Sequence, residues 1–156
     1  MPLWNIYHPP TTFKEESAKQ SLARDITTIY TSIGLPAFYV VVNFIPMPLG
    51  SMYIGGAPND SASTVSKKPF VRFSIDHIAV RLPDDDAEYR RVVDKINGIL
   101  KPHVEDKGYG WEFHVNETER RLWSIDGFEP PGFGSEGERV WREKGEAVAL
   151  EKEEGK

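Results

Sequence analysis

The sequence contains no cysteine, no long hydrophobic run and no cluster of basic residues. Without cysteine the chain has no disulfide, no thiolate nucleophile and no cysteine-bound zinc, and this composition is consistent with a reducing compartment. No apolar run approaches the roughly 20 residues of a membrane-spanning helix, and no basic segment followed by an apolar block marks a secretory signal. We therefore expect a cytoplasmic protein that does not associate with a membrane.

Basic residues are outnumbered by acidic ones, 19 to 24, which gives a net charge of -5. Neutralising phosphates requires clustered lysine and arginine, so we expect no nucleic-acid partner. The four histidines, at positions 8, 77, 103 and 114, share no predicted element at the spacing of metal ligands, so no metal site is expected. No phosphate-binding loop is present, and we expect no cofactor.

Proline at position 2 is followed directly by a strand-like apolar stretch, Leu3–Tyr7. Methionine aminopeptidases remove Met1 when the second residue is small, and the mature chain would then begin with a secondary amine. Burial beside apolar groups lowers the pKa of an amine toward neutrality, where it serves as a general acid or base. The alternative is that Pro2 has no catalytic role, as in many proteins with proline second.

With 156 residues, 39% of them hydrophobic, the chain has the size of one globular domain. Its first half reads as a strand, a helix and a strand. The strand Leu3–Tyr7 precedes a capping box, Thr12 with Glu15, that predicts the start of an amphipathic helix. β-Branched and aromatic residues then predict a buried strand over Phe38–Ile45 and a short one over Met52–Ile54. The apolar face of the helix consists of Ala18, Leu22, Ile26, Ile29 and Ile33.

The same order repeats after a loop at residues 57–68. Phe70–Ile78 reads as a strand, Pro83–Asp86 opens a helix with acids in its first turn, and Trp111–Val115 reads as a further strand. The offset of roughly 70 residues between the units indicates an internal duplication. The apolar stripe of this second helix consists of Tyr89, Val92, Val93, Ile96, Ile99, Leu100 and Val104.

Each β-α-β unit should contain parallel strands joined by a right-handed crossover. We therefore predict an α/β fold of two tandem β-α-β units, a two-layer sandwich with a four-stranded sheet and two helices. The sequence provides no third layer, so oligomerisation is expected to cover the other face of the sheet.

We place one domain at residues 1–133, with its two halves at about 2–56 and 70–116. The segment 117–133 mixes apolar residues with charges and prolines, and it predicts a short helix and a loop packed on the body or on a neighbouring subunit. Residues 134–156 are mostly charged or glycine and are predicted to be a charged tail, in which Trp141 could anchor a short helix.

The N-terminal proline, the leading strand and the duplicated unit together resemble the tautomerase superfamily. More narrowly, the chain is similar to the fused group typified by cis-3-chloroacrylic acid dehalogenase. The resemblance implies a homotrimer whose sheets form a barrel-like core, and an active site around Pro2 that takes a small carboxylate substrate. The resembling segments are Pro2–Tyr7, the helix Ser17–Tyr30, Val42–Phe44, Tyr53–Gly56, Phe70–Val71 and the strand around Trp111.

In enzymes of this group the proline works with arginines that hold the substrate carboxylate. The family's arginine pair falls near His77 and Arg81, so the first arginine is replaced by a histidine here. The resemblance implies that Arg81 binds the carboxylate bidentately and that His77 polarises a carbonyl oxygen. The alternative for His77 is a hydrogen-bonded structural role. Arg72 is another candidate, but on a regular strand it points away from His77, and a salt bridge is its alternative.

Two positions depart from the dehalogenase pattern. Its histidine near the end of the first helix is Tyr30 in this chain, and its strand tyrosine is Phe113, with His114 next to it. Trp4 and Phe113 would supply apolar walls to the pocket, and core packing is the alternative for both. The residues that replace the water-activating pair are therefore of a different chemical type.

The family's glutamate, which helps to activate water, falls near Ile125 and Asp126, with Glu117 and Glu119 as other candidates. Dehalogenation by hydration needs a positioned water and a base for it, whereas keto–enol tautomerisation needs one proton shuttle and a carboxylate anchor. The residues present fit the simpler chemistry better.

The sequence thus predicts a tautomerase-like enzyme in which Pro2 is the acid/base and Tyr30 and His77 assist. Three alternatives stay open. The chain could be a hydratase or dehalogenase of 3-substituted acrylates that uses the same proline. It could be a superfamily member that acts as a protein ligand. It could also be a plain α/β domain that dimerises around a hydrophobic ligand.

Overall fold

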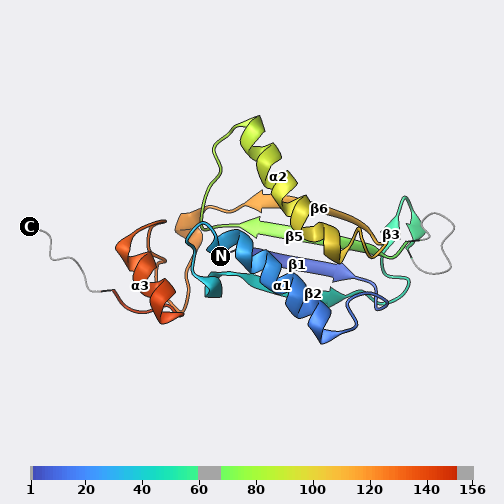
Figure 1. Cartoon of the computed structure of the whole chain (residues 1–156), viewed down its shortest axis with the longest axis horizontal. Helices are drawn as coiled ribbons and strands as arrows, with labels where there is room; N and C mark the ends of the chain where they lie inside the picture. The colour runs from blue at the N-terminus through green and yellow to red at the C-terminus, as the bar shows by residue number, and fades with distance from the viewer. Residues whose placement is uncertain (1, 60–67, 151–156) are drawn as a thin grey trace, which may run out of the picture.

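The computed structural model describes residues 2–59 and 68–150, which form a sheet layer and a helix layer (Figure 1). The sheet has four strands in the order β2-β1-β5-β6. These are β2 (Val41–Pro46), β1 (Leu3–His8), β5 (Phe70–His77) and β6 (Gly110–Glu117). The helices α1 (Glu16–Thr31) and α2 (Asp86–Leu100) lie across one face of this sheet, as Figure 1 shows.

The two β-α-β units meet at the centre of the sheet. β1 runs parallel to β2, and β5 runs parallel to β6, whereas β1 and β5 are antiparallel. In the central pair, Leu3 lies opposite Asp76 and Tyr7 lies opposite Arg72, so the two units face each other across the middle of the sheet. The predicted α/β sandwich with a four-stranded sheet and two helices is confirmed.

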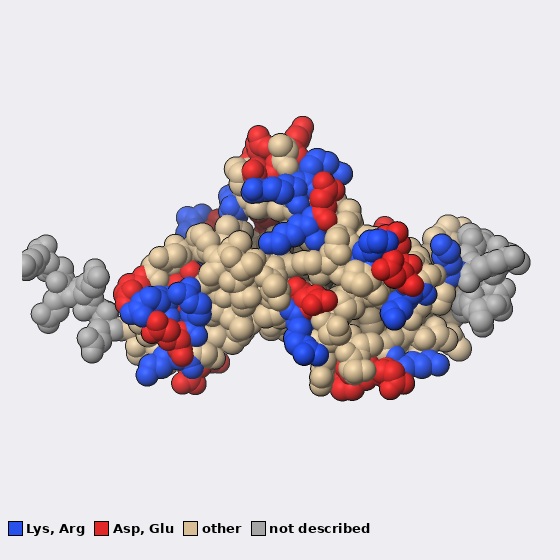
Figure 2. Space-filling model, in the orientation of Figure 1, with Lys and Arg blue, Asp and Glu red and all other residues tan. Residues whose placement is uncertain are grey.

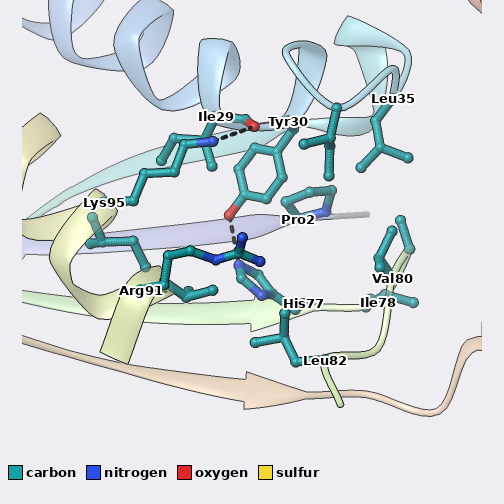
Figure 3. A pocket seen from close by; sticks show the side chains of 14 residues that line it. Pro2, Ile29, Tyr30, Leu35, His77, Ile78, Val80, Leu82, Arg91 and Lys95 are labelled. Atoms are coloured by element: carbon teal, nitrogen blue, oxygen red, sulfur yellow. Dashed lines mark hydrogen bonds between the residues drawn. The ribbon is translucent and has the colours of Figure 1, made fainter. Parts of the chain in front are cut away.

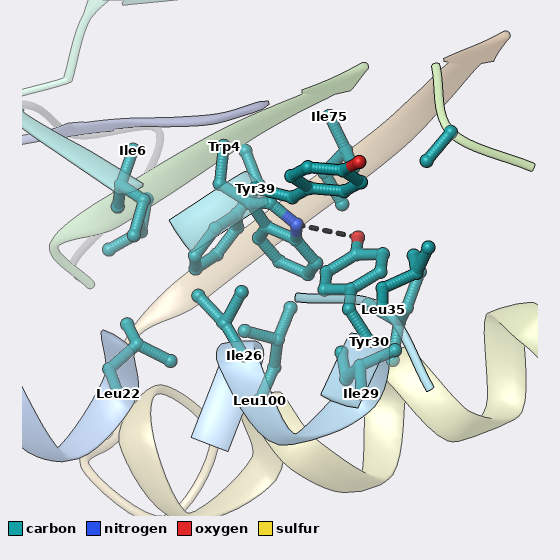
Figure 4. Packing of buried hydrophobic residues seen from close by; sticks show 14 of the residues in the cluster. Trp4, Ile6, Leu22, Ile26, Ile29, Tyr30, Leu35, Tyr39, Ile75 and Leu100 are labelled. Carbon is teal, nitrogen blue, oxygen red and sulfur yellow. Dashed lines mark hydrogen bonds between the residues drawn. The ribbon is translucent and has the colours of Figure 1, made fainter. Parts of the chain in front are cut away.

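The hydrophobic core lies between the helices and the inner face of the sheet. Every second residue of β1 is buried, and β5 follows the same alternation, as expected for strands with one covered face. Figure 4 shows side chains of α1 and α2 meeting those of the strands. Burying each large aliphatic side chain contributes about 1.5–3 kcal/mol. The fully buried members include Trp4, Ile6, Leu22, Ile26, Phe73, Ile75, Ile96 and Leu100.

The start of the first helix differs from the sequence-based prediction, whereas the second helix begins within the predicted segment Pro83–Asp86. Thr12 does not cap α1, because its hydroxyl donates to the carbonyl of Pro9 at 3.0 Å and lies beside His8. The helix begins at Glu16 instead. In the second unit, the carboxylate of Asp85 accepts from the amide of Glu88 at 2.9 Å, so α2 begins at Asp86.

The entry into β2 also differs from the prediction. The start of the expected strand Phe38–Ile45 forms a single 3₁₀ turn, η1 (Ala37–Tyr39), and β2 begins at Val41. The turn directs Tyr39 into the core, where its side chain is fully buried. The short strands β3 (Tyr53–Ile54) and β4 (Ala57–Pro58) form a hairpin, so the predicted loop 57–68 begins with a strand. The rest of that loop, residues 60–67, lies outside the described residues.

The C-terminal segment packs against the end of the body that carries η1. The helices η2 (Lys101–His103) and η3 (Arg120–Leu122) flank β6, and α3 (Glu136–Lys144) follows them. The Trp141 side chain is buried, and its ring lies 6.2 Å from that of Phe38 and 6.3 Å from that of Tyr39. The packed part of the chain therefore continues beyond residue 133, into the segment predicted as a charged tail.

The outer face of the sheet carries polar side chains, and no helix of the described residues covers it. Arg72 bonds to Nδ1 of His114 at 2.9 Å and forms an ion pair with Glu112. Asn43 donates to Asn5 at 2.9 Å on the neighbouring pair of strands. Within residues 2–59 and 68–150, no helix is both long and apolar enough to cross a bilayer.

Candidate active site

A cavity of about 370 Å³ opens where the residue before β1, the end of α1, the segment after β5 and the inner side of α2 meet (Figure 3). Its walls are mostly aliphatic, and the polar groups among them come from three elements. The lining residues are Pro2, Ile29, Tyr30, Ile33, Leu35, His77, Ile78, Ala79, Val80, Leu82, Arg91, Val92, Lys95 and Ile96.

Pro2 is held at this cavity by the sheet. Its carbonyl oxygen accepts a hydrogen bond from the amide of Val41 at 3.0 Å, which extends the pairing of β1 and β2 to the start of the chain. The residue is buried, and Figure 3 shows its ring beside Tyr30. The parallel ladder thus fixes the backbone position of the residue that would carry the amino-terminal amine.

A chain of hydrogen bonds runs from the core to the cavity through Tyr30. The indole Nε1 of Trp4 donates to the Tyr30 hydroxyl at 2.8 Å, and this hydroxyl lies 2.8 Å from Nε2 of His77. Because Trp4 can only donate, the hydrogen of the Tyr30 hydroxyl is free to bond to His77. Nε2 then acts as the acceptor, which places the imidazole proton on Nδ1.

Burial keeps both members of the Tyr30–His77 pair uncharged near neutral pH. It raises the pKa of Tyr30 well above its ordinary value of 10.0, and the bond from Trp4 only partly opposes this. Burial also lowers the pKa of His77 below its ordinary value of 6.5, against a smaller raising effect of the Glu117 carboxylate. A neutral phenol and a neutral imidazole are hydrogen-bond partners for a developing oxyanion and do not bring a counter-charge of their own.

The structure brings together three of the residues singled out in the sequence, namely Pro2, Tyr30 and His77. Trp4 is completely buried below Tyr30, so it packs in the core and holds the tyrosine. Phe113 stacks on Trp111 with 6.2 Å between ring centroids, at β6, and does not line the cavity.

The arginine candidates lie elsewhere. Arg72 is on the outer face of the sheet with His114, opposite to the face of His77, as the strand alternation predicts. Arg81 is exposed and is not among the lining residues. The charge of Arg81 lowers the pKa values of Tyr89 and Glu119, so Arg81 lies near the start of α2 and the segment after β6.

None of the acidic candidates lines the cavity. Glu117 accepts a hydrogen bond from the amide of Leu82 at 2.6 Å, which ties β6 to the segment after β5. Glu119 bonds to Arg121, and this contact lowers the pKa of its carboxyl to about 2. Asp126 occupies a turn with φ of 50°, and it does not line the cavity. Among the described residues, no group of three or more histidine, aspartate and glutamate side chains is arranged to hold a metal ion.

Two basic residues at the cavity were not identified from the sequence. Arg91 and Lys95 both extend from α2 into its lining. The sequence does contain a pattern that could have indicated them. The two lie four residues apart on one helix face, and each directly precedes an apolar residue, Val92 or Ile96. From the sequence alone, however, this edge of the helix cannot be told from a solvated one.

Comparison with known proteins gives the chain a family. The sequence matches the family described as "Putative oxalocrotonate tautomerase enzyme" over residues 1–146. Native RhCC from Rhodococcus jostii RHA1 is 34% identical, with a TM-score of 0.84, and the match covers 95% of this chain and 99% of that chain. A probable enzyme from the thermophilic fungus Aspergillus fumigatus is 39% identical, with a TM-score of 0.84, over 96% and 98% of the two chains. No curated protein matches the sequence significantly.

More distant structures share the fold. N1, a member of the cis-3-chloroacrylic acid dehalogenase family, is 15% identical with a TM-score of 0.65, over 92% of this chain and 97% of that chain. The wild-type fused 4-OT, described as an asymmetric trimer, is 19% identical with a TM-score of 0.57, over 81% of this chain and 94% of that chain. Since the family match spans almost the whole sequence and two relatives exceed 30% identity, the chain belongs to this tautomerase family, as the resemblance of its sequence to the dehalogenase-like group indicates.

Proposed function

We propose that the protein is a tautomerase that uses the amine of Pro2, after removal of Met1, as a general acid and base on a 2-oxo acid or its enol. The observation that carries the proposal is the position of Pro2, Tyr30 and His77 on one apolar cavity. Such walls disfavour the charged form of an amine and so make the neutral base available near pH 7.

The proposed reaction moves one proton at a time. The neutral amine of Pro2 takes the proton of the enol hydroxyl. The protonated amine then delivers a proton to C3, the double-bond carbon that does not bear the oxygen, and this gives the keto form. His77 donates through its second ring nitrogen to the substrate oxygen, where negative charge develops. Tyr30 is a positioning residue, because its hydroxyl holds Nε2 of His77 at 2.8 Å.

The alternative chemistry is hydration or dehalogenation of a 3-substituted acrylate by the same proline. It requires a carboxylate base that is free to activate water. Glu117 and Glu119 are both bound to other groups, to the Leu82 amide and to Arg121, and neither lines the cavity. This arrangement favours tautomerisation. A role as a protein ligand, with no use of the proline, would leave the cavity without turnover.

The test begins with intact-mass analysis, which shows whether Met1 is removed. Turnover of phenylenolpyruvate and of 3-haloacrylates is then compared for the wild type and Pro2→Ala, with a pH–rate profile for each. We expect tautomerase activity that depends on a base with a pKa below that of a free prolyl amine, and loss of most of this activity in Pro2→Ala. Retention of Met1, or equal turnover by the variant, would contradict the proposal.

We further propose that the protein is a homotrimer. Within the described part of the chain no helix covers the outer face of the sheet, which carries Arg72, His114 and Asn43, and the fused 4-OT structure is described as a trimer. Light scattering should therefore give three times the 17.7 kDa of one chain. A dimer would support the plain ligand-binding domain instead.

A further inference from the structure

We propose that Arg91 of α2, supported by Lys95 one turn further along, is the carboxylate anchor of this cavity, and that the ligand is a monocarboxylate with a bulky apolar body. The proposal rests on the proposed function for the class of ligand. It is tested by binding alone, so it does not depend on the chemistry of Pro2.

The charged side chains of the cavity lining are all positive. Arg91 and Lys95 are its basic residues, and none of the lining residues is an aspartate or glutamate. Figure 2 shows basic and acidic side chains together over α2, beside a surface that is mostly uncharged. Two cations with no acid among the lining residues favour an anionic ligand over a cationic one.

Arg91 has hydrogen-bonding capacity to spare. One terminal nitrogen contacts Glu88, three residues earlier on the same helix. The guanidinium has five N–H donors in a planar fork, which leaves others for a carboxylate. Its side chain is 75% exposed, and an exposed pair of this kind is weak, so a ligand can replace Glu88 at little cost. Arg91 lines the same cavity as Tyr30 and His77.

Lys95 fixes the position of this edge of the cavity. Its ammonium lies 3.5 Å from the carbonyl oxygen of Ile29 and 3.4 Å from the hydroxyl of Ser32, both at the end of α1. These long contacts join the two helices across the cavity rim. The lysine therefore adds positive charge from a held position, while Arg91 supplies the bidentate contact.

The remainder of the lining sets the size and polarity of the ligand. Opposite α2, the cavity is walled by aliphatic side chains from the end of α1, from the segment after α1 and from the segment after β5, including Ile29, Ile33, Leu35, Ile78 and Val80. A haloacrylate would leave most of the 370 Å³ unfilled. An aryl or branched alkyl group would bury its surface against these side chains and gain about 25 cal/mol for each Å² removed from water.

The experiment measures binding of 3-phenylpropionate by calorimetry, with 3-phenylpropionamide as its neutral counterpart. The variants are Arg91→Gln, Arg90→Gln and Arg81→Gln. Arg90→Gln is the matched control. It removes the same charge from the neighbouring residue, and Arg90 does not line the cavity. Arg91 is exposed, so its loss should leave the free energy of unfolding unchanged, which urea denaturation checks.

We expect Arg91→Gln to weaken binding of the acid by about 10- to 100-fold, as loss of a charged hydrogen-bonded contact does, with little change for the amide. Arg90→Gln and Arg81→Gln should bind the acid as the wild type does. Equal weakening by Arg90→Gln would show a general field and overturn the assignment, as would weakening by Arg81→Gln instead of Arg91→Gln. Absence of binding to the wild type would also overturn it. The calorimetric readout requires no turnover, whereas the proton shuttle is tested by turnover, so a failure of the anchor and a failure of the proton shuttle give different results.

Discussion

The hydroxyl group of Tyr30 should stabilise the fold far more than that of Tyr39, although both tyrosines are buried. Tyr30→Phe removes the oxygen that accepts from Trp4 and bonds to His77, each at 2.8 Å. Trp4 is completely buried, so its indole N–H cannot turn to water when the acceptor is lost. The variant therefore leaves a buried donor without a partner.

The magnitude follows from that unpaired donor. A buried polar group left without a partner costs about 1–3 kcal/mol, and the lost bond to His77 adds to this. A domain of this size loses about 2–4 °C in Tm for each kcal/mol. We therefore expect Tyr30→Phe to lower the free energy of unfolding by about 2 kcal/mol and the Tm by several degrees.

Tyr39→Phe is the matched control. The Tyr39 side chain is as deeply buried, but among the described residues its hydroxyl has no hydrogen-bond partner. Removing a buried hydroxyl that makes no bond relieves its desolvation cost, so this variant should be as stable as the wild type or more stable. The same atom is deleted in both variants, and only its hydrogen bonds differ.

Urea denaturation monitored by tryptophan fluorescence gives both free energies, and differential scanning calorimetry gives the Tm. A Tyr30→Phe variant within about 0.5 kcal/mol of the wild type would refute the reasoning, because that is the range of neutral surface substitutions. A loss of stability in Tyr39→Phe equal to that in Tyr30→Phe would refute it as well, since burial alone would then explain both.

Three further outcomes are expected. Because burial lowers the pKa of His77, the unfolded chain binds more protons than the folded one below the ordinary pKa of 6.5, so the free energy of unfolding should rise with pH from about 5 to about 7. His77→Gln should flatten part of this rise in urea denaturation, and an unchanged slope would contradict the shift. Trp141→Ala should cost about 3–5 kcal/mol, because the ring is buried against Phe38 and its Nε1 donates to the carbonyl of Val148 at 2.8 Å; a loss below 1 kcal/mol would mean that α3 does not dock in solution. Arg72→Glu should dissociate the proposed trimer in sedimentation experiments, because it sets a second carboxylate beside Glu112 on the outer face; a normal trimer would indicate that this face is not buried between subunits.

The fold could be predicted because each half of the chain repeats one local pattern. Strand alternation and the helical spacing of apolar residues identified every main element, and the crossover rule set the strands of each unit parallel. The errors lie at element ends, where one local hydrogen bond decides. Thr12 has the right spacing for a cap, yet its hydroxyl is used by the turn that begins at Pro9.

The candidate site was predictable only in part, for a geometric reason. Pro2, Tyr30 and His77 are on elements whose order brings them to one end of the sheet, and the resemblance to tautomerases points to that end. Arg91 contributes from α2 because this helix inclines across the sheet, which no sequence spacing reports. Arg81 is closer to His77 in sequence, but it follows the end of β5 and stays exposed.

Because the Val41 amide bonds to the Pro2 carbonyl, the fold does not depend on removal of Met1, whereas the proposed activity does. The sheet uses the oxygen of Pro2 and not its nitrogen, which has no N–H while Met1 precedes it and becomes a secondary amine only when Met1 is removed. A chain that keeps Met1 would thus lose no hydrogen bond of the sheet, while its proline nitrogen would be an amide without basicity. Specific activity would then report the fraction of processed amino termini in a preparation, and an inactive sample could be fully folded.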